Sequence, residues 1–127
     1  MTGFERPHYV AGKLLTVDDL ELEQRYHIEK RRLLNRMLHG PGIVSGLAVA
    51  GGTGGTETVE PGFALHPQGR ESLVCGPQKL TIPESGEPVS ICLLYREHET
   101  SRGTICETYE LVATTAVPEN AVVLAVM

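Results

Sequence analysis

The sequence predicts an α+β fold, in which one long N-terminal helix is followed by an antiparallel β-sandwich or small β-barrel. From Val17 to about Leu38 no Gly or Pro interrupts a helical pattern of apolar and charged residues. After Gly40 the pattern changes to short strand-like runs between turns, in a chain with 14 Gly and 8 Pro. We expect one domain over residues 1–127, with a lead-in and helix over 1–40 and a β body over 41–127.

The first elements are a lead-in over residues 1–13 and the start of the helix. Pro7 disfavours an early helix, and the segment His8–Gly12 is expected to pair as a short edge strand. Thr16 is the expected N-cap, and Asp19, three residues later, completes a short-armed capping box. The helix is therefore expected to begin at Val17.

The predicted helix is polarised in charge and broad in its apolar surface. Four acidic residues crowd its first turns and four basic residues its last turns, which complements the helix dipole. The apolar residues form two rows, with Ile28 further round. The first row is Leu22, Tyr26, Leu33 and Met37, and the second is Leu20, His27, Leu34 and Leu38. Either one row packs on the chain's own sheet and the other on a second copy, or both rows make one wide intrachain contact.

The β body is predicted as a series of short strands beginning directly after the Gly40-Pro41-Gly42 turn. Its first run, residues 42–50, is followed by a glycine-rich connection over 51–57, expected to be hairpin-like. The later runs are divided by turns at Pro61-Gly62 and Pro67-Gln68-Gly69. They lie at 58–60, 62–65, 70–75, 78–83, 88–99, 104–115 and 121–127. This spacing favours an antiparallel sandwich or small barrel.

Charge and composition exclude several classes of partner. The net charge is -5, and residues 41–127 hold four Lys/Arg against ten Asp/Glu, so no nucleic-acid partner is expected. No apolar run is long enough to span a membrane, and the start lacks the order of a secretory signal, so we expect a cytoplasmic protein without membrane insertion. The cysteines Cys75, Cys92 and Cys106 lie far apart among apolar residues, which is typical of reduced buried thiols.

No motif of catalysis or metal binding appears in the sequence. The five histidines lack the spacing that presents two imidazoles to one ion, and the glycine-rich segments lack the Lys-Ser/Thr of a phosphate-binding loop. Glu97 and Glu107 can face each other on neighbouring strands, as glycosidase carboxylates do, but a solvated strand face accounts for them better. We therefore expect no enzyme, no metal and no cofactor.

Several linked motifs resemble a recurring bacterial pattern. It consists of a G-K-L-L-T helix start, E-Q-x-Y-H, N-R-x-L-H-G and G-x-V-x-G-L-x-V, found here at Gly12–Thr16, Glu23–His27, Asn35–Gly40 and Gly42–Val49. The resemblance continues at residues 60–65, 67–71, 94–97 and 107–111, and so covers most of the chain. Proteins with this pattern are similar to baseplate- or fibre-associated components of phage tails and contractile injection systems. A looser similarity is to the N-terminal module of the type VI secretion baseplate adaptor.

The resemblance implies a non-enzymatic structural component of a phage-tail-like contractile particle. It implies self-association, as a trimer, and contacts with other tail or baseplate proteins. The chain departs from longer relatives by a short loop after Glu99 and by ending at Met127, so no C-terminal receptor-binding or effector part is expected. The residues expected at the oligomer interface are Leu22, Tyr26, Leu33, Met37, Arg32 and Arg36, and Arg31, Arg32 and Arg36 are expected to meet acidic groups of a neighbouring β body.

Two alternatives remain open at the level of sequence. One is a small enzyme or ligand-binding domain that uses a pocket containing His66, Glu97, Glu99 or Glu107. The other is a stand-alone module that binds a carbohydrate or a protein on its sandwich face.

Overall fold

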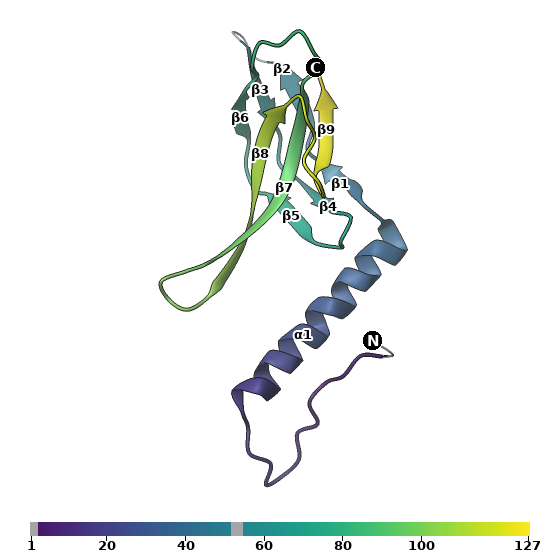
Figure 1. Ribbon diagram of the computed structural model, residues 1–127, viewed down its shortest axis with the longest axis vertical. Helices are drawn as coiled ribbons and strands as arrows, with labels where there is room; N and C mark the ends of the chain where they lie inside the picture. Colours follow the sequence, from purple (N-terminus) through teal and green to yellow (C-terminus); the bar gives the residue numbers. More distant parts are fainter. Residues whose placement is uncertain (1–2, 52–54) are drawn as a thin grey trace.

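A computed structural model describes residues 3–51 and 55–127 (Figure 1). Helix α1 (Val17–Leu34) continues into a π-helical turn η1 (Asn35–His39), and strands follow to the end of the described chain. They are β1 (Gly42–Gly46), β2 (Val49–Gly51), β3 (Thr56–Val59), β4 (Gly62–Leu65), β5 (Glu71–Val74), β6 (Gln78–Thr81), β7 (Ser90–Glu99), β8 (Ile105–Thr114) and β9 (Val122–Val126). The predicted α+β class, with its long N-terminal helix, is confirmed.

The helix begins and ends where local chemistry requires. The Thr16 side chain accepts from the Asp19 amide at 3.2 Å, and the Asp19 carboxylate accepts from the Thr16 amide at 3.2 Å, so the predicted capping box is present. At the other end the Gly40 amide donates to the Asn35 carbonyl at 2.9 Å, and Gly40 turns into a positive φ of 79° that stops the helix. The prediction of an edge strand at His8–Gly12 is wrong, because this segment pairs with none of the described strands and makes a turn instead.

The described strands form three antiparallel sheets of three strands each, and these do not close into a barrel. Their orders are β1-β4-β5, β2-β3-β6 and β8-β7-β9. The first predicted run is divided into β1 and β2 at Leu47, whose φ is 61° and whose amide donates to the Pro61 carbonyl at 3.1 Å. Residues 52–54 of the glycine-rich connection predicted over 51–57 lie outside the described residues. Its predicted bounds were too wide, because Gly51 belongs to β2 and Thr56 and Glu57 belong to β3, and the two strands pair as in a hairpin.

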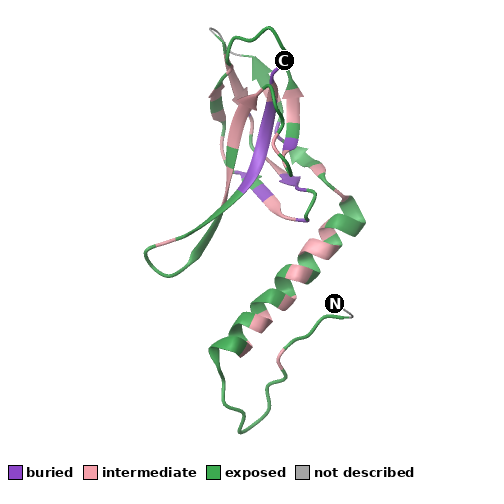
Figure 2. Ribbon diagram, in the orientation of Figure 1, coloured by how far each residue is buried: buried purple, intermediate pink, exposed green. Residues whose placement is uncertain are grey.

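All three sheets contribute to one hydrophobic core. Strand β7 supplies Ile91 and Leu93, both fully buried, and Figure 2 shows it as the most continuously buried strand. Val59, Ala64 and Val74 of the other two sheets complete the core, together with Val122 of β9 and Leu47 of the link between β1 and β2. Because Leu47 lies in the short link between β1 and β2, it anchors the start of the β body beneath the sheets.

The helix contributes nothing to this core. None of the residues of α1 or η1 is buried, and Figure 1 shows α1 leading away from the β body, with the lead-in turning back beside it. Both predictions of intrachain packing for the apolar rows are therefore wrong, because neither row packs on the chain's own sheet. Within the described residues, no helix is both long enough and apolar enough to cross a membrane.

Candidate interaction surface on the helix and its junction with the body

The helix meets the β body through polar groups of its last turns. The Arg31 guanidinium binds the carboxylate of Glu71 on β5 with two hydrogen bonds, one of them 2.7 Å long. The Asn35 amide donates to the Gly69 carbonyl at 2.8 Å and to Glu71 at 3.2 Å, and Arg36 donates to the Gln68 carbonyl at 3.3 Å. We call these contacts between α1–η1 and the β4–β5 turn the junction.

The β4–β5 turn fits against the helix because residue 69 is glycine. Gly69 has a φ of 84°, and a Cβ there would overlap the Arg32 carbonyl oxygen and lie 2.8 Å from the Arg32 carbonyl carbon. The turn is held by hydrogen bonds from the His66 amide to the Arg70 carbonyl at 2.9 Å and from the Gly69 amide to the His66 carbonyl at 2.8 Å. Backbone of the turn and backbone of the helix are thus in direct contact.

The carboxylate of Glu71 is kept ionised by the junction. Partial burial raises the pKa of Glu71, but the hydrogen bonds and charge of Arg31, with the Asn35 amide, outweigh it and hold the pKa below its ordinary value. Arg31 and Arg36 were predicted to contact acidic groups on the β body of a neighbouring copy. In this structure both side chains also contact the β body of their own chain. Sequence reasoning missed Asn35, Gly69 and Glu71, since their contacts join residues more than thirty positions apart.

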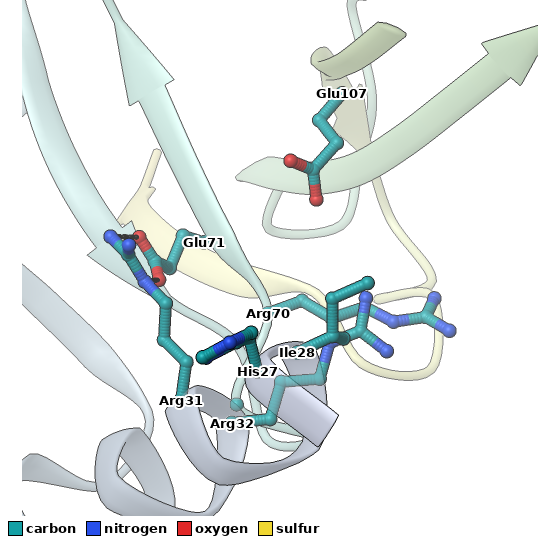
Figure 3. Close-up of a pocket in the computed structure, with 8 residues that line it drawn as sticks. His27, Ile28, Arg31, Arg32, Arg70, Glu71 and Glu107 are labelled. Atoms are coloured by element: carbon teal, nitrogen blue, oxygen red, sulfur yellow. Dashed lines mark hydrogen bonds and ion pairs between the residues drawn. The ribbon is translucent and has the colours of Figure 1, made fainter. Parts of the chain in front are cut away.

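A cavity of about 360 Å³ lies beside the junction, between α1 and β8 (Figure 3). In Figure 3 Arg31 and Glu71 are joined, and Glu107 of β8 lies apart from them across the cavity. Arg32, one of the expected interface residues, lines this cavity with Arg70. In the described part of the chain no group of three or more His, Cys, Asp or Glu residues is arranged to hold a metal ion.

The first apolar row is partly covered by the lead-in. Leu22 and Tyr26 are half-buried and share a shallow groove with Phe4. The Lys30 ammonium lies 4.8 Å from the centre of the Tyr26 ring and 5.7 Å from that of Phe4, so a cation–π contact fastens the lead-in to this side. Leu33 is also half-buried, but Met37, the last member of the row, remains 72 % exposed.

The members of the second row are all exposed, and we call it the outer row: Leu20, His27, Leu34 and Leu38. Its leucines are 46 %, 56 % and 82 % exposed, and His27 is exposed as well. Such a line of large apolar side chains is unusual on a surface unless it serves a contact. The outer row runs between the junction and the lead-in, because His27 lines the cavity beside the junction and also a groove with His8 and Tyr9 of the lead-in.

The residues of the predicted enzymatic alternative are placed in two unlike settings. His66 is 2 % exposed; its Nδ1 lies 3.0 Å from the Asn120 carbonyl oxygen and its Nε2 lies 2.7 Å from Ser72 Oγ. Because the carbonyl can only accept, Nδ1 donates to it and the Ser72 hydroxyl donates to Nε2. Ser72 is also 2 % exposed, so this Ser–His pair lies in the core, where its hydrogen bonds are satisfied and its hydroxyl is covered.

The glutamates gather on the long β7–β8 hairpin. Glu97 and Glu107 are directly opposite, as predicted for facing strands, and both carboxylates lie 2.7 Å from the Tyr95 hydroxyl. Glu99 lies further along, opposite Ile105, and is exposed. Burial and the two carboxylates raise the pKa of Tyr95. His66 therefore does not share a pocket with Glu97, Glu99 and Glu107: the Tyr95 ring, 6.3 Å from its own, lies between them.

No protein-family model matches the chain, and no curated protein matches it.

Proposed function

We propose that this protein is a non-enzymatic structural component of a phage-tail-like contractile particle, a baseplate or fibre adaptor that acts as a homo-oligomer. One observation carries the proposal: α1 lies outside the hydrophobic core, has no buried residue, and presents the exposed outer row along its length. The ordered motifs from Gly12 to Val49 resemble those of tail components, and this resemblance is the reason for proposing a phage-tail-like particle.

A helix in this position needs a partner to be stable. Most helical stability in proteins comes from packing of an apolar face rather than from the propensity of the helix itself. The junction supplies polar contacts at one end only, and the lead-in covers only the first row. Association through the outer row buries the remaining apolar side chains and holds the helix along its whole length.

The rest of the molecule suits a building block. The β body has its own core, and its charge of ten Asp/Glu against four Lys/Arg disfavours nucleic acid and favours contact with other proteins. The partners in this proposal are further copies of the chain and other tail or baseplate proteins. No cofactor, metal or membrane insertion is needed for such a role.

Sedimentation velocity at tens of micromolar tests self-association. We expect a discrete oligomer, which Leu34→Ser with Leu38→Ser converts to monomer because both side chains belong to the outer row. Ile105→Ser is the matched control, since Ile105 is exposed to a similar degree but lies on the β7–β8 hairpin. A strict monomer in the unmodified chain, or equal effects of the two variants, contradicts the proposal.

Association with a particle requires a separate experiment. An epitope-tagged chain produced in its native cell is expected to sediment with contractile particles and to be found with sheath and tube proteins by mass spectrometry. The Leu34→Ser, Leu38→Ser chain is expected to leave this fraction, while the Ile105→Ser chain stays. Purified particles that lack the tagged chain contradict the assignment to a particle, whatever the oligomeric state.

A further inference from the structure

We infer that two copies of this chain pair through their helices in antiparallel orientation, about a two-fold axis that passes at His27. The inference rests on the self-association in the proposed function and goes beyond it, because it fixes the occupant of the outer row, its direction and its register. Three features of α1 carry it: the spacing of the row, the distribution of charge, and the exposure of the leucines in the row.

The outer row has the spacing of a helix–helix seam. Leu20, His27 and Leu34 follow one another at intervals of seven residues, which returns the side chain to nearly the same side after two turns. Leu38 extends the row by one turn beyond Leu34. A straight partner helix can therefore contact every member at once, whereas a globular surface would need a matching groove of the same length.

The charges of the helix decide the direction of the partner. Acidic residues occupy the first turns, at Asp18, Asp19, Glu21 and Glu23, and basic residues the last, at Lys30, Arg31, Arg32 and Arg36. Parallel helices would place acidic turns beside acidic turns and basic beside basic. Antiparallel helices place each acidic end beside a basic end, and their dipoles also oppose each other favourably.

The register follows from the symmetry of the row. Leu20 and Leu34 both lie seven residues from His27, so a two-fold axis at His27 sets Leu20 of one copy beside Leu34 of the other. Glu23 and Arg31 both lie four residues from His27, so the same axis sets these opposite charges at the same level twice, although Glu23 also lines a groove with Tyr9 of the lead-in. Arg31 uses Nε and one terminal nitrogen for Glu71 and keeps its other N–H donors for a second carboxylate.

The leucines of the outer row are exposed within one chain, and His27 between them, also exposed, borders the cavity beside the junction and a groove with the lead-in. The junction contacts run from Arg31 and Asn35 to the β4–β5 turn, and the lead-in lies against Leu22 and Tyr26 on another side. Figure 2 shows long exposed stretches of α1, in agreement with the exposure of Leu20 and Leu34. An antiparallel partner also carries its β body to the far end of the helix, away from the first body. The trimer implied by the motif resemblance, with parallel helices round one axis, lacks this complementarity.

Site-specific cross-linking of the full chain tests the arrangement. The exposed thiols are first removed by Cys75→Ser and Cys106→Ser, while Cys92 is buried and stays. Leu20→Cys and Leu34→Cys chains are then mixed and treated with a short bis-maleimide, which spans helices whose axes are about 8–10 Å apart. We expect the 20–34 product to predominate over 20–20 and 34–34 by mass spectrometry of linked peptides. Arg25→Cys, on a side of α1 away from the outer row, is the control and is expected to give little product.

The possible results separate this inference from the proposed function. Dominant 20–20 and 34–34 products, in chains that sediment as oligomers, overturn the antiparallel pairing and leave self-association standing. Cross-linking of Arg25→Cys equal to that of Leu20→Cys overturns the assignment to the outer row. Monomers by sedimentation without specific products overturn both the inference and the proposed self-association. Circular dichroism of each variant checks that the helix is retained.

Discussion

The Arg31 guanidinium donates to both carboxylate oxygens of Glu71, a residue 40 positions further along the chain. This bidentate pair joins the last turns of α1 to β5, and the Asn35 amide adds a third donor to the same carboxylate. Because no helix residue is buried, these hydrogen bonds and the close approach at Gly69 hold the direction in which the helix leaves the body.

Replacing Glu71 is expected to loosen the junction without unfolding the β body. Glu71→Gln removes the charge and one acceptor, and exposed ion pairs are worth about 0.2–1 kcal/mol. We expect hydrogen exchange of the amides from Arg31 to Asn35 to rise up to roughly fivefold, the factor for about 1 kcal/mol, while exchange in β7 stays the same.

The control for this prediction is Glu110→Gln. Glu110 accepts from Arg96 at 2.9 Å in an exposed pair on the β7–β8 hairpin, so the chemical change is the same but the helix is untouched. Equal acceleration in both variants, or none in Glu71→Gln, would show that the junction does not depend on this carboxylate.

The junction is also expected to weaken in acid. Burial raises the pKa of Glu71 but hydrogen bonds from Arg31 and Asn35 outweigh it, so the pKa of the docked group lies below the ordinary 4.5. Above pH 4.5 the stabilisation is complete; as the pH falls below 4.5 the undocked carboxylate is protonated first, and stabilisation is lost until the docked group is protonated too. Exchange of the Arg31–Asn35 amides, corrected for intrinsic rates, should rise over this range in the natural chain and change less in Glu71→Gln.

A methyl group at position 69 is expected to separate the turn from the helix. Gly69→Ala meets the strain of a positive φ, about 1 kcal/mol or more, and also the overlap with the Arg32 carbonyl. Gly103→Ala has the same kind of strain, at a φ of 74°, with nothing within 4 Å of the new Cβ. Urea denaturation should show a larger loss of unfolding free energy for Gly69→Ala, with faster exchange near Arg32. Equal losses would mean that the contact with the helix is unimportant.

Local signals made much of this fold predictable. The Thr16–Asp19 capping box depends on residues three apart, and the turns at Pro61-Gly62 and Pro67-Gln68-Gly69 fall where the structure places them. The facing of Glu97 and Glu107 follows from one hairpin and was predictable for the same reason. The edge strand at His8–Gly12 was not, because its alternation of residue types gives no information on whether a neighbouring strand is within reach.

The junction and the hydrogen bonds of His66 could not be predicted from the sequence for a different reason. Glu71 is one of ten acidic residues in the β body, and only the folded chain brings it to Arg31. His66, a residue of the predicted enzymatic or ligand-binding alternative, is buried and forms hydrogen bonds with Ser72 and with Asn120, which is 54 positions away. Only one residue among many of the same type makes each of these long-range contacts, and the periodicity of the sequence does not show which one.

The Tyr95 hydroxyl is expected to stabilise the hairpin by separating two carboxylates. One phenol donates a single hydrogen bond at a time, so it alternates between Glu97 and Glu107, each 2.7 Å away. Tyr95→Phe should lower the unfolding free energy by about 1 kcal/mol, because the loss of a hydrogen bond to a charged group leaves opposed glutamates. Tyr109→Phe is the control: Tyr109 is the direct partner of Tyr95, and its hydroxyl makes no hydrogen bond within the described residues. A similar loss in both variants would contradict the role of the hydroxyl.

The buried Ser72–His66 pair makes a further prediction about pH. Burial lowers the pKa of His66 and the charge of Arg70 adds to this, while the hydrogen bond to the Asn120 carbonyl only partly opposes it. The folded pKa is therefore below the ordinary 6.5, so the unfolded chain binds more protons than the folded chain as the pH falls below 6.5. The contribution of His66 to stability is complete above pH 6.5 and is lost towards the folded pKa. Urea denaturation between pH 7.5 and pH 5, about the range in which histidine titrates, should show this fall.

Substitution separates this effect from other titrating groups. Ser72→Ala removes the donor to Nε2 and should cost about 1–3 kcal/mol at neutral pH, since a buried acceptor is left without a partner. His98→Gln, at an exposed position near the end of β7, should leave both the stability and its fall in acid unchanged. If the fall in acid disappears in His98→Gln, or if Ser72→Ala costs nothing, His66 and Ser72 do not act as the buried pair that their 2.7 Å contact indicates.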